Sequence, residues 1–102
     1  MIDLQIQHFF SGGVYARHMH LPAGHFAQSH RHTFEHLSIL AQGEVLLEVD
    51  GVTTRYCAPA CITIAANAVH TITAIRDTTW YCIHATHETD PDKIDHSLIK
   101  EV

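Results

Sequence analysis

The stretch "AGHFAQSHRHTFEHLSILAQG", from Ala23 to Gly43, decides how this chain is interpreted. It contains four histidines, His25, His30, His32 and His36. On a β-strand, His30 and His32 would project to the same face, about 6–7 Å apart. Two imidazoles at that spacing can converge on one ion, with metal–nitrogen bonds of about 2.0–2.1 Å. The stretch is therefore a candidate for a metal site carried by β-strands, but H-x-H alone also occurs by chance in a chain with eleven histidines, as HMH at 18–20 shows.

The bulk composition indicates one globular domain. The chain has 102 residues, 46% of them hydrophobic and 17% charged, with a formal charge of −5. This length suits a single domain with its own core. Clustered basic residues, which a nucleic-acid partner requires, are missing from the sequence. No stretch approaches the roughly 20 apolar residues of a membrane span, and no secretory signal is recognisable at the N-terminus.

The three cysteines predict a reducing compartment. Cys57, Cys61 and Cys82 cannot all pair within one chain, so we expect free thiols in the cytoplasm. Their C-x3-C spacing is not that of a standard zinc site.

Alternating apolar residues dominate the chain and predict an all-β sandwich or barrel over about 14–86. Asp50-Gly51 suits a type I′ hairpin turn. Ile2, Leu4 and Ile6 also alternate and predict an edge strand over about 2–7. The expected strands of the barrel are 14–21, 36–41, 44–50, 52–57, 61–66, 70–75 and 79–86.

The C-terminal tail has a different pattern. Asp90 is a good helix N-cap, and Pro91 suits the first helical position. Ile94, Leu98 and Val102 recur at four-residue spacing. We therefore expect a short helix over about 91–101 that packs one apolar stripe on the barrel.

The histidine spacing resembles the first sequence motif of the cupin superfamily, G-x5-H-x-H-x3-4-E-x6-G. Gly24, His30, His32, His36 and Gly43 occupy its positions. Downstream, "APACITIAANAVH" resembles the second cupin motif, which ends in a fourth metal ligand, here His70. The resemblance implies one cupin domain over 1–102, a double-stranded β-helix or jelly-roll barrel. It also implies one divalent transition metal per subunit, held by His30, His32, His36 and His70.

The sequence departs from these motifs at two places. His36 stands where most cupins have a glutamate. Glu35 is adjacent, but it breaks the six-residue step to Gly43 and would point to the opposite face of a strand. The third ligand is therefore His36 in this register, and Glu35 if the register is wrong. In the second motif, Ala65, Ala66 and Asn67 replace P-x-G, and Asn67 can still adopt the left-handed conformation of the lost glycine.

The remaining histidines are less informative. We expect His25 at the rim of the barrel, and His18 and His20 on one strand face, outside the barrel or at a subunit contact. His84 shares a strand face with Trp80 and Cys82, as a pocket residue or a satisfied core histidine. His8, His87 and His96 lie near the termini and are expected to be solvated.

Three functional classes fit this sequence. The resemblance implies a metal-dependent enzyme, dioxygenase-like or with related chemistry, that acts on a small organic substrate. The alternatives are a binding module without turnover and a protein whose metal only stabilises the barrel. Imidazole ligands suit Fe, Ni, Zn or Cu, an octahedral site could also hold Mn, and the sequence does not choose among these ions. The catalytic residues stay unassigned.

Two further expectations concern the pocket and the subunits. Polar candidates for lining the pocket are Tyr15, Arg17, Ser38, Tyr81 and His84, although the sequence does not say which of them face inward. The resemblance and the apolar N-terminal edge predict a homodimer, because an open edge strand exposes unpaired backbone groups.

Overall fold

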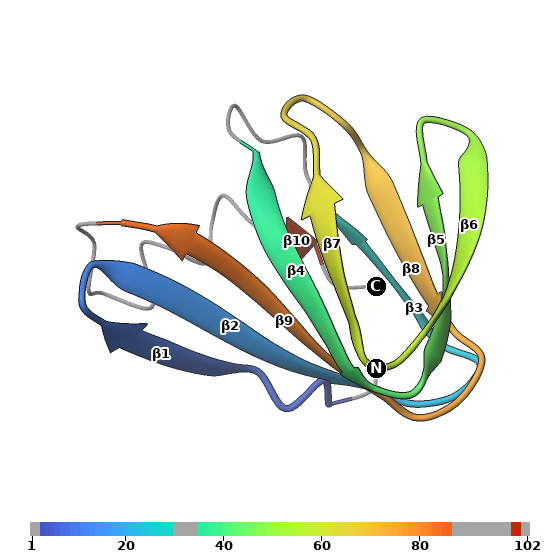
Figure 1. The fold of residues 1–102 in the computed structure, drawn as a ribbon. Helices are drawn as coiled ribbons and strands as arrows, with labels where there is room; N and C mark the ends of the chain where they lie inside the picture. The colour runs from blue at the N-terminus through green and yellow to red at the C-terminus, as the bar shows by residue number, and fades with distance from the viewer. Residues whose placement is uncertain (1–2, 30–34, 87–98, 101–102) are drawn as a thin grey trace.

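The computed structural model describes residues 3–29, 35–86 and 99–100. Its strands form two five-stranded antiparallel sheets (Figure 1). The first, sheet A, has the order β1-β2-β9-β4-β7, and the second, sheet B, has the order β10-β3-β8-β5-β6. The strands are β1 (Gln7–Ser11), β2 (Val14–Leu21), β3 (Phe26–Ser29), β4 (His36–Gln42), β5 (Glu44–Val49), β6 (Val52–Cys57), β7 (Ala60–Ile64), β8 (His70–Ala74), β9 (Thr78–Ala85) and β10 (Ile99–Lys100).

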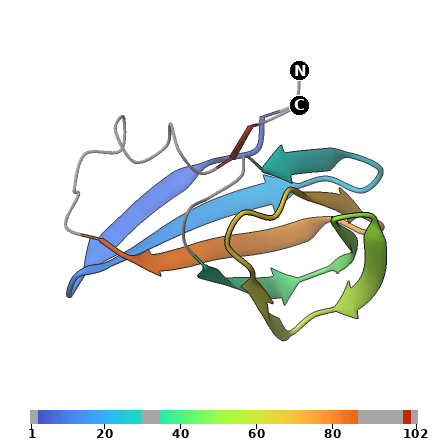
Figure 2. The same ribbon diagram turned by 90° about the horizontal axis from the view of Figure 1, so that it is seen from above.

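The chain changes sheet at most of its turns, as a jelly roll does. It passes from β2 to β3, from β4 to β5, from β6 to β7 and from β8 to β9 between the two sheets. Strands that are distant in sequence therefore pair, for example β2 with β9 (Figure 2). The expected all-β barrel is confirmed.

Strand alternation produces the core between the sheets. Along β2 and β8, every second residue is buried. Most of these positions carry apolar side chains, whose burial is the main favourable term in folding. The largest fully buried apolar side chains are Trp80, Tyr15, Met19, Leu21, Leu40, Ile64, Ile72 and Val45.

Two predicted turn conformations are present. Asp50 and Gly51 both have positive φ, 49° and 85°, as a type I′ turn requires, and they join Val49 to Val52 in the β5–β6 hairpin. Asn67 has a φ of 62°, the left-handed conformation expected from the altered second motif.

The chain ends differ from the sequence expectation. Residues 3–6 have no strand assignment, and β1 begins at Gln7 instead of spanning about 2–7. Leu4 is nevertheless buried, and its carbonyl oxygen accepts a 2.7 Å hydrogen bond from the backbone amide of His20. Most of the expected helix over about 91–101 lies outside the described residues. Its described part is wrong, because Ile99–Lys100 forms a strand that pairs with β3.

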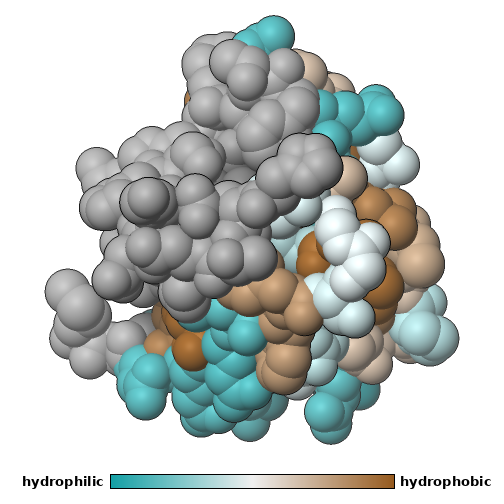
Figure 3. Space-filling model, turned by 90° about the vertical axis from the view of Figure 1, so that its left-hand side faces the viewer, coloured by the Kyte–Doolittle hydropathy of each residue, from teal (hydrophilic) through white to brown (hydrophobic). Residues whose placement is uncertain are grey.

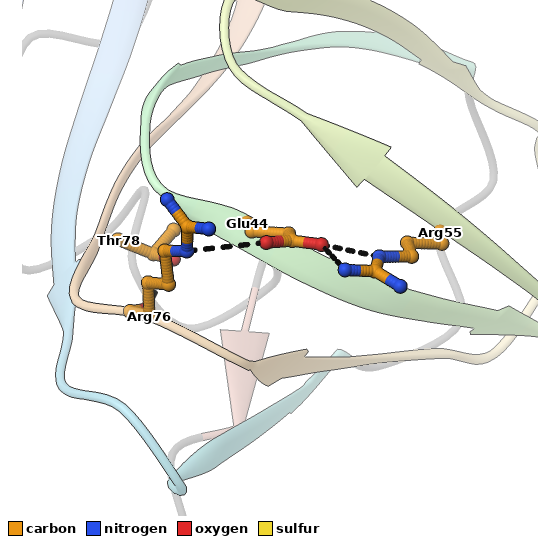
Figure 4. A network of polar contacts seen from close by, with 4 residues as sticks. All are labelled: Glu44, Arg55, Arg76 and Thr78. Atoms are coloured by element: carbon orange, nitrogen blue, oxygen red, sulfur yellow. Dashed lines mark hydrogen bonds and ion pairs between the residues drawn. The ribbon is translucent and has the colours of Figure 1, made fainter.

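A buried carboxylate lies where β4 turns into β5. The side chain of Glu44 is 5% exposed and forms ion pairs with Arg55 and with Arg76, the latter at 3.3 Å (Figure 4). The Glu44 carbonyl oxygen also accepts a 2.8 Å hydrogen bond from the amide of Ile75. These contacts fix the end of β4 that is opposite to His36.

No helix in the described part of the chain is long and apolar enough to cross a membrane.

Candidate metal centre

His36 and His70 meet between the two sheets. His36 is the first residue of β4 in sheet A, and His70 is the first residue of β8 in sheet B. Their exposed fractions are 4% and 1%, and their ring centroids are 6.1 Å apart. The jelly-roll topology thus brings together two histidines that are far apart in the sequence.

The ring separation limits how this pair could share an ion. With metal–nitrogen bonds of about 2.0–2.1 Å, two imidazole rings on one ion have centroids about 5 Å apart at a tetrahedral angle and at most about 6.4 Å apart when the ion lies directly between them. The observed 6.1 Å is close to this upper limit, so a shared ion would lie nearly between the two rings. His30 and His32 lie outside the described residues. Within residues 3–29, 35–86 and 99–100, no group of three or more histidine, cysteine or acidic side chains is close enough to hold a metal.

Strand parity separates His36 from Glu35. His36, Ser38 and Leu40 are buried on the inner face of β4, whereas Glu35 is exposed. His36, which is separated from Gly43 by six intervening residues, is therefore the side chain that faces the interior.

Several polar side chains lie on the inner face of sheet A, the face that carries His36. Four of the five polar candidates face inward: Tyr15, Arg17, Ser38 and His84 lie on the same strand faces as core residues. Tyr81 faces outward, where its ring packs edge-on against His18 at 5.3 Å. His18 and His20 alternate with buried residues on β2 and so lie on the outer face, as expected.

Tyr15 is held by two histidines. Its hydroxyl shares a 2.7 Å hydrogen bond with Nδ1 of His8, and its ring meets His84 edge-on at 5.3 Å. The expectation that His8 is solvated is wrong, because β1 pairs with β2 and turns His8 toward Tyr15. The sequence of β1, QHFFS, does not alternate between polar and apolar residues and so held no signal that could have placed His8. His25 is exposed, as expected for the rim, whereas His87 and His96 lie outside the described residues.

Cys82 adds a buried thiol to the same face. Burial raises the pKa of the Cys82 thiol, while the positive charge of Arg17 and hydrogen bonds involving Trp80 and Ser38 act in the opposite direction. Cys57 and Cys61 are exposed, and all three cysteines are free.

A cavity of about 320 Å³ lies at the His36 end of sheet A. Its volume is within the range of small-molecule sites. The cavity is lined by the inward residues His36 and His84 and by residues that do not face the core, namely Glu35, Leu37, Thr63, Ile83 and Ala85. Because residues of both kinds line it, the cavity lies at the rim of the sheet.

Comparison with known families identifies the fold. The model of the cupin domain family matches residues 17–84, which is most of the barrel. The chain belongs to the cupin family. A search of curated protein sequences finds no match.

Solved cupin structures share this fold at low sequence identity. A cupin 2 domain-containing protein from Halorhodospira halophila superposes with a TM-score of 0.73 at 17% identity, over 94% of this chain and 76% of that chain. An RmlC-like cupin from Methanocaldococcus jannaschii gives 0.68 at 20% identity, over 88% and 84% of the two chains. Salicylate 1,2-dioxygenase from Pseudoaminobacter salicylatoxidans gives 0.64 at 11% identity, over 70% of this chain and 19% of that chain. These similarities establish the double-stranded β-helix.

Proposed function

We propose that this cupin domain binds one divalent transition metal ion per subunit through His30, His32, His36 and His70 and presents it to a small organic ligand. The observation that carries the proposal is the buried pair of His36 and His70, which start strands in opposite sheets. Imidazole favours Fe, Ni, Zn or Cu over Mg or Ca, and an octahedral site could also hold Mn.

The chemistry depends on coordination number. Four neutral ligands leave the +2 charge of the ion intact, and a six-coordinate ion would offer two positions to a ligand, with Lewis acidity and, for Fe or Mn, redox chemistry. A four-coordinate zinc would be closed and structural. Other residues of the chain shape the site and keep water out of the core. His36 and His84 border the rim cavity, while Trp80 and Leu40, both fully buried, exclude water from the core below.

We favour an enzyme over a binding module, with oxygen-dependent chemistry as the leading reaction class. The similarity to a salicylate 1,2-dioxygenase supports this choice at the level of the fold, and the inward polar group beside His36 supplies hydrogen-bonding partners for a substrate. A ligand-binding cupin without turnover is the alternative. We place the protein in the cytoplasm, which agrees with its three free cysteines.

The test is the metal content per subunit of protein purified without added metal. Substitution of alanine for any of the four ligand histidines should empty the site. Glu35→Ala should leave it occupied, because Glu35 is exposed, and His18→Ala and His20→Ala are matched controls on the outer face of β2. His36→Glu should retain an ion, because a carboxylate is also a ligand for these metals.

Two results would overturn this assignment. If Glu35→Ala empties the site and His36→Ala does not, the centre has three histidines and one carboxylate. If wild-type protein holds no metal, the histidines have another role.

We also propose that the subunits form a homodimer through sheet A. Strand β1 lies at the edge of this sheet and, among the described strands, pairs with β2 alone, so backbone groups on its other side are open to a second subunit. The outer face of this sheet carries Phe9, Val14 and Leu37, which are 50%, 44% and 42% exposed. Figure 3 shows small hydrophobic areas scattered among hydrophilic ones on one face of the molecule.

Light scattering tests the dimer. We expect wild-type protein at twice the 11.4 kDa of one chain, and a shift toward monomer for Leu37→Lys. Val52→Lys is the control, because Val52 is 68% exposed but lies in sheet B. A wild-type species that stays at 11.4 kDa at all concentrations would refute the dimer.

A further inference from the structure

Sheet B carries an apolar row on its outer face. Phe26 of β3, Thr73 of β8 and Leu46 of β5 are register partners in neighbouring strands. They alternate with core residues along their strands, so their side chains point away from the barrel interior. Phe26 and Leu46 are 47% and 37% exposed, and Ile75, just beyond β8 on the same face, is 40% exposed. Three large apolar side chains therefore share one exposed surface.

Two arginines form a positive border on one side of this row. The side chains of Arg55 and Arg76 both reach the carboxylate of Glu44, the first residue of β5 (Figure 4). Both arginines are exposed, whereas Glu44 is buried. Asp77 lies outside this face, in the turn to β9, where its carboxylate accepts a hydrogen bond from the amide of Ala23. The border keeps a net positive charge, because two guanidinium groups surround one carboxylate.

Two carboxylates form a negative border on the opposite side of the row. Glu48 lies two residues after Leu46 on the same face of β5, and Asp50 follows in the β5–β6 turn. Both are exposed. They line a cavity of about 220 Å³ together with the polar residues Gln28 and Thr71. The negative border is therefore also hollowed.

The order of the borders makes this face complementary to itself. Along β5, the positive border at Glu44, the apolar row at Leu46 and the negative border at Glu48 follow one another at intervals of about 7 Å. Consider a two-fold axis that runs along the apolar row, across the strands. It would place the apolar row against its own copy and each positive border against a negative one. Because a two-fold interface uses the same patch of both copies, one such contact satisfies both.

We propose that the outer face of sheet B docks onto the same face of a second copy of this chain, with Arg55 and Arg76 of one copy against the carboxylates of Glu48 and Asp50 of the other. Complementary charges of this kind fix the register of an interface. The contact is separate from the proposed homodimer through sheet A and would join two such dimers.

The size of the face predicts a weak contact. Four strands about 4.8 Å apart and six residues at about 3.4 Å each give on the order of 400 Å² per copy. A standard protein interface buries about 800 Å² per partner. Sheet B should therefore associate only at high protein concentration, where dimers become tetramers.

Light scattering over a range of concentrations tests the contact, with a reducing agent present because Cys57 and Cys61 are exposed. The mass of wild-type protein should rise up to twofold between about 10 μM and about 1 mM, the range of weak affinities. Leu37→Lys should halve the mass by removing the sheet A contact and should leave the rise in place. A wild-type mass that is the same at both concentrations would overturn the proposal.

Charge reversal identifies the surface responsible. Glu48→Arg should weaken the association at least about tenfold, because the two-fold axis repeats each reversed contact. Glu35→Arg is the matched control, since it makes the same change in charge at an exposed position of the other sheet's rim. Arg76→Glu combined with Glu48→Arg should restore the association. A rise in mass that survives Glu48→Arg as fully as Glu35→Arg would refute the role of sheet B, and a rise that only Leu37→Lys abolishes would belong to sheet A.

A second measurement needs no change in sheet B. In Leu37→Lys protein, the backbone amide resonances of Leu46 and Thr73 should shift as the concentration rises, whereas those of Ala16 and Ile83, on the outer face of sheet A, should stay in place. Shifts confined to sheet A, or no shifts at all, would overturn the proposal. Neither outcome bears on the metal site, whose occupancy is measured separately.

Discussion

Substitution of alanine for Gly43 should destabilise the domain more than the same change at another glycine with positive φ. Gly43 has a φ of 103° at the β4–β5 turn. A Cβ atom built there would lie 2.5 Å from the carbonyl oxygen of Asp77, 2.5 Å from Oγ1 of Thr78 and 2.8 Å from Cα of Thr78. Two of these three atoms belong to the backbone, so rotation of a side chain cannot relieve the contact.

The magnitude has two parts. A left-handed conformation costs an L-residue about 1–2 kcal/mol. Forcing an extra carbon into a packed site costs about 1–3 kcal/mol more. The free energy of unfolding should therefore fall by about 2–5 kcal/mol. Since 1 kcal/mol shifts the melting temperature of a domain of this size by about 4–8 °C, we expect a loss of at least about 8 °C.

Gly51→Ala is the matched control. Gly51 also has a positive φ, 85°, but no atom lies within 4 Å of a Cβ built there. It should lose only the conformational part, about 1–2 kcal/mol. Urea unfolding followed by circular dichroism, with chelator present to remove any stabilisation by metal, measures both variants. If the two variants lose the same free energy of unfolding, the close contact of position 43 with Asp77 and Thr78 does not add to the cost of the substitution.

Three further outcomes are expected. Bound metal keeps its histidine ligands deprotonated and so depresses their apparent pKa below the ordinary value of about 6.5. The stabilisation by metal should therefore be complete above the ordinary histidine pKa and disappear as the pH falls through the depressed apparent pKa of the ligands. Equal melting temperatures with and without chelator at pH 7.5 would contradict this. Because burial raises the pKa of the Cys82 thiol, a thiol reagent at pH 8 should modify Cys57 and Cys61 rapidly and Cys82 only after unfolding, whereas three fast thiols in the native protein would contradict this. Glu44→Gln should lower the free energy of unfolding by about 1 kcal/mol, because its partners Arg55 and Arg76 are exposed and remain solvated, and the loss should shrink in 1 M salt. Glu48→Gln, at an exposed position of β5, should change stability by less than about 0.5 kcal/mol.

The local features of this protein could be predicted from its sequence. Alternation of apolar residues indicated the strands, because side chains on a strand project to opposite faces in turn. The same parity, counted back from Gly43, separated inward His36 from exposed Glu35. Asp50, Gly51 and Asn67 indicated turns, since few residues tolerate positive φ. Each of these properties depends on neighbouring residues only.

Pairings between distant segments were decided by the tertiary structure. Both faces of β2 mix polar and apolar residues, so only the packing of sheet A against sheet B decides that Arg17 is buried and His18 faces outward. Likewise, no local pattern links His36 to His70, which meet because β4 and β8 belong to opposite sheets. At Ile99–Lys100, pairing with β3 replaces the last turn of the helix that the sequence pattern predicted for these two residues. Helical propensity amounts to only a few tenths of a kcal/mol per residue, so backbone pairing at an open sheet edge can outweigh it.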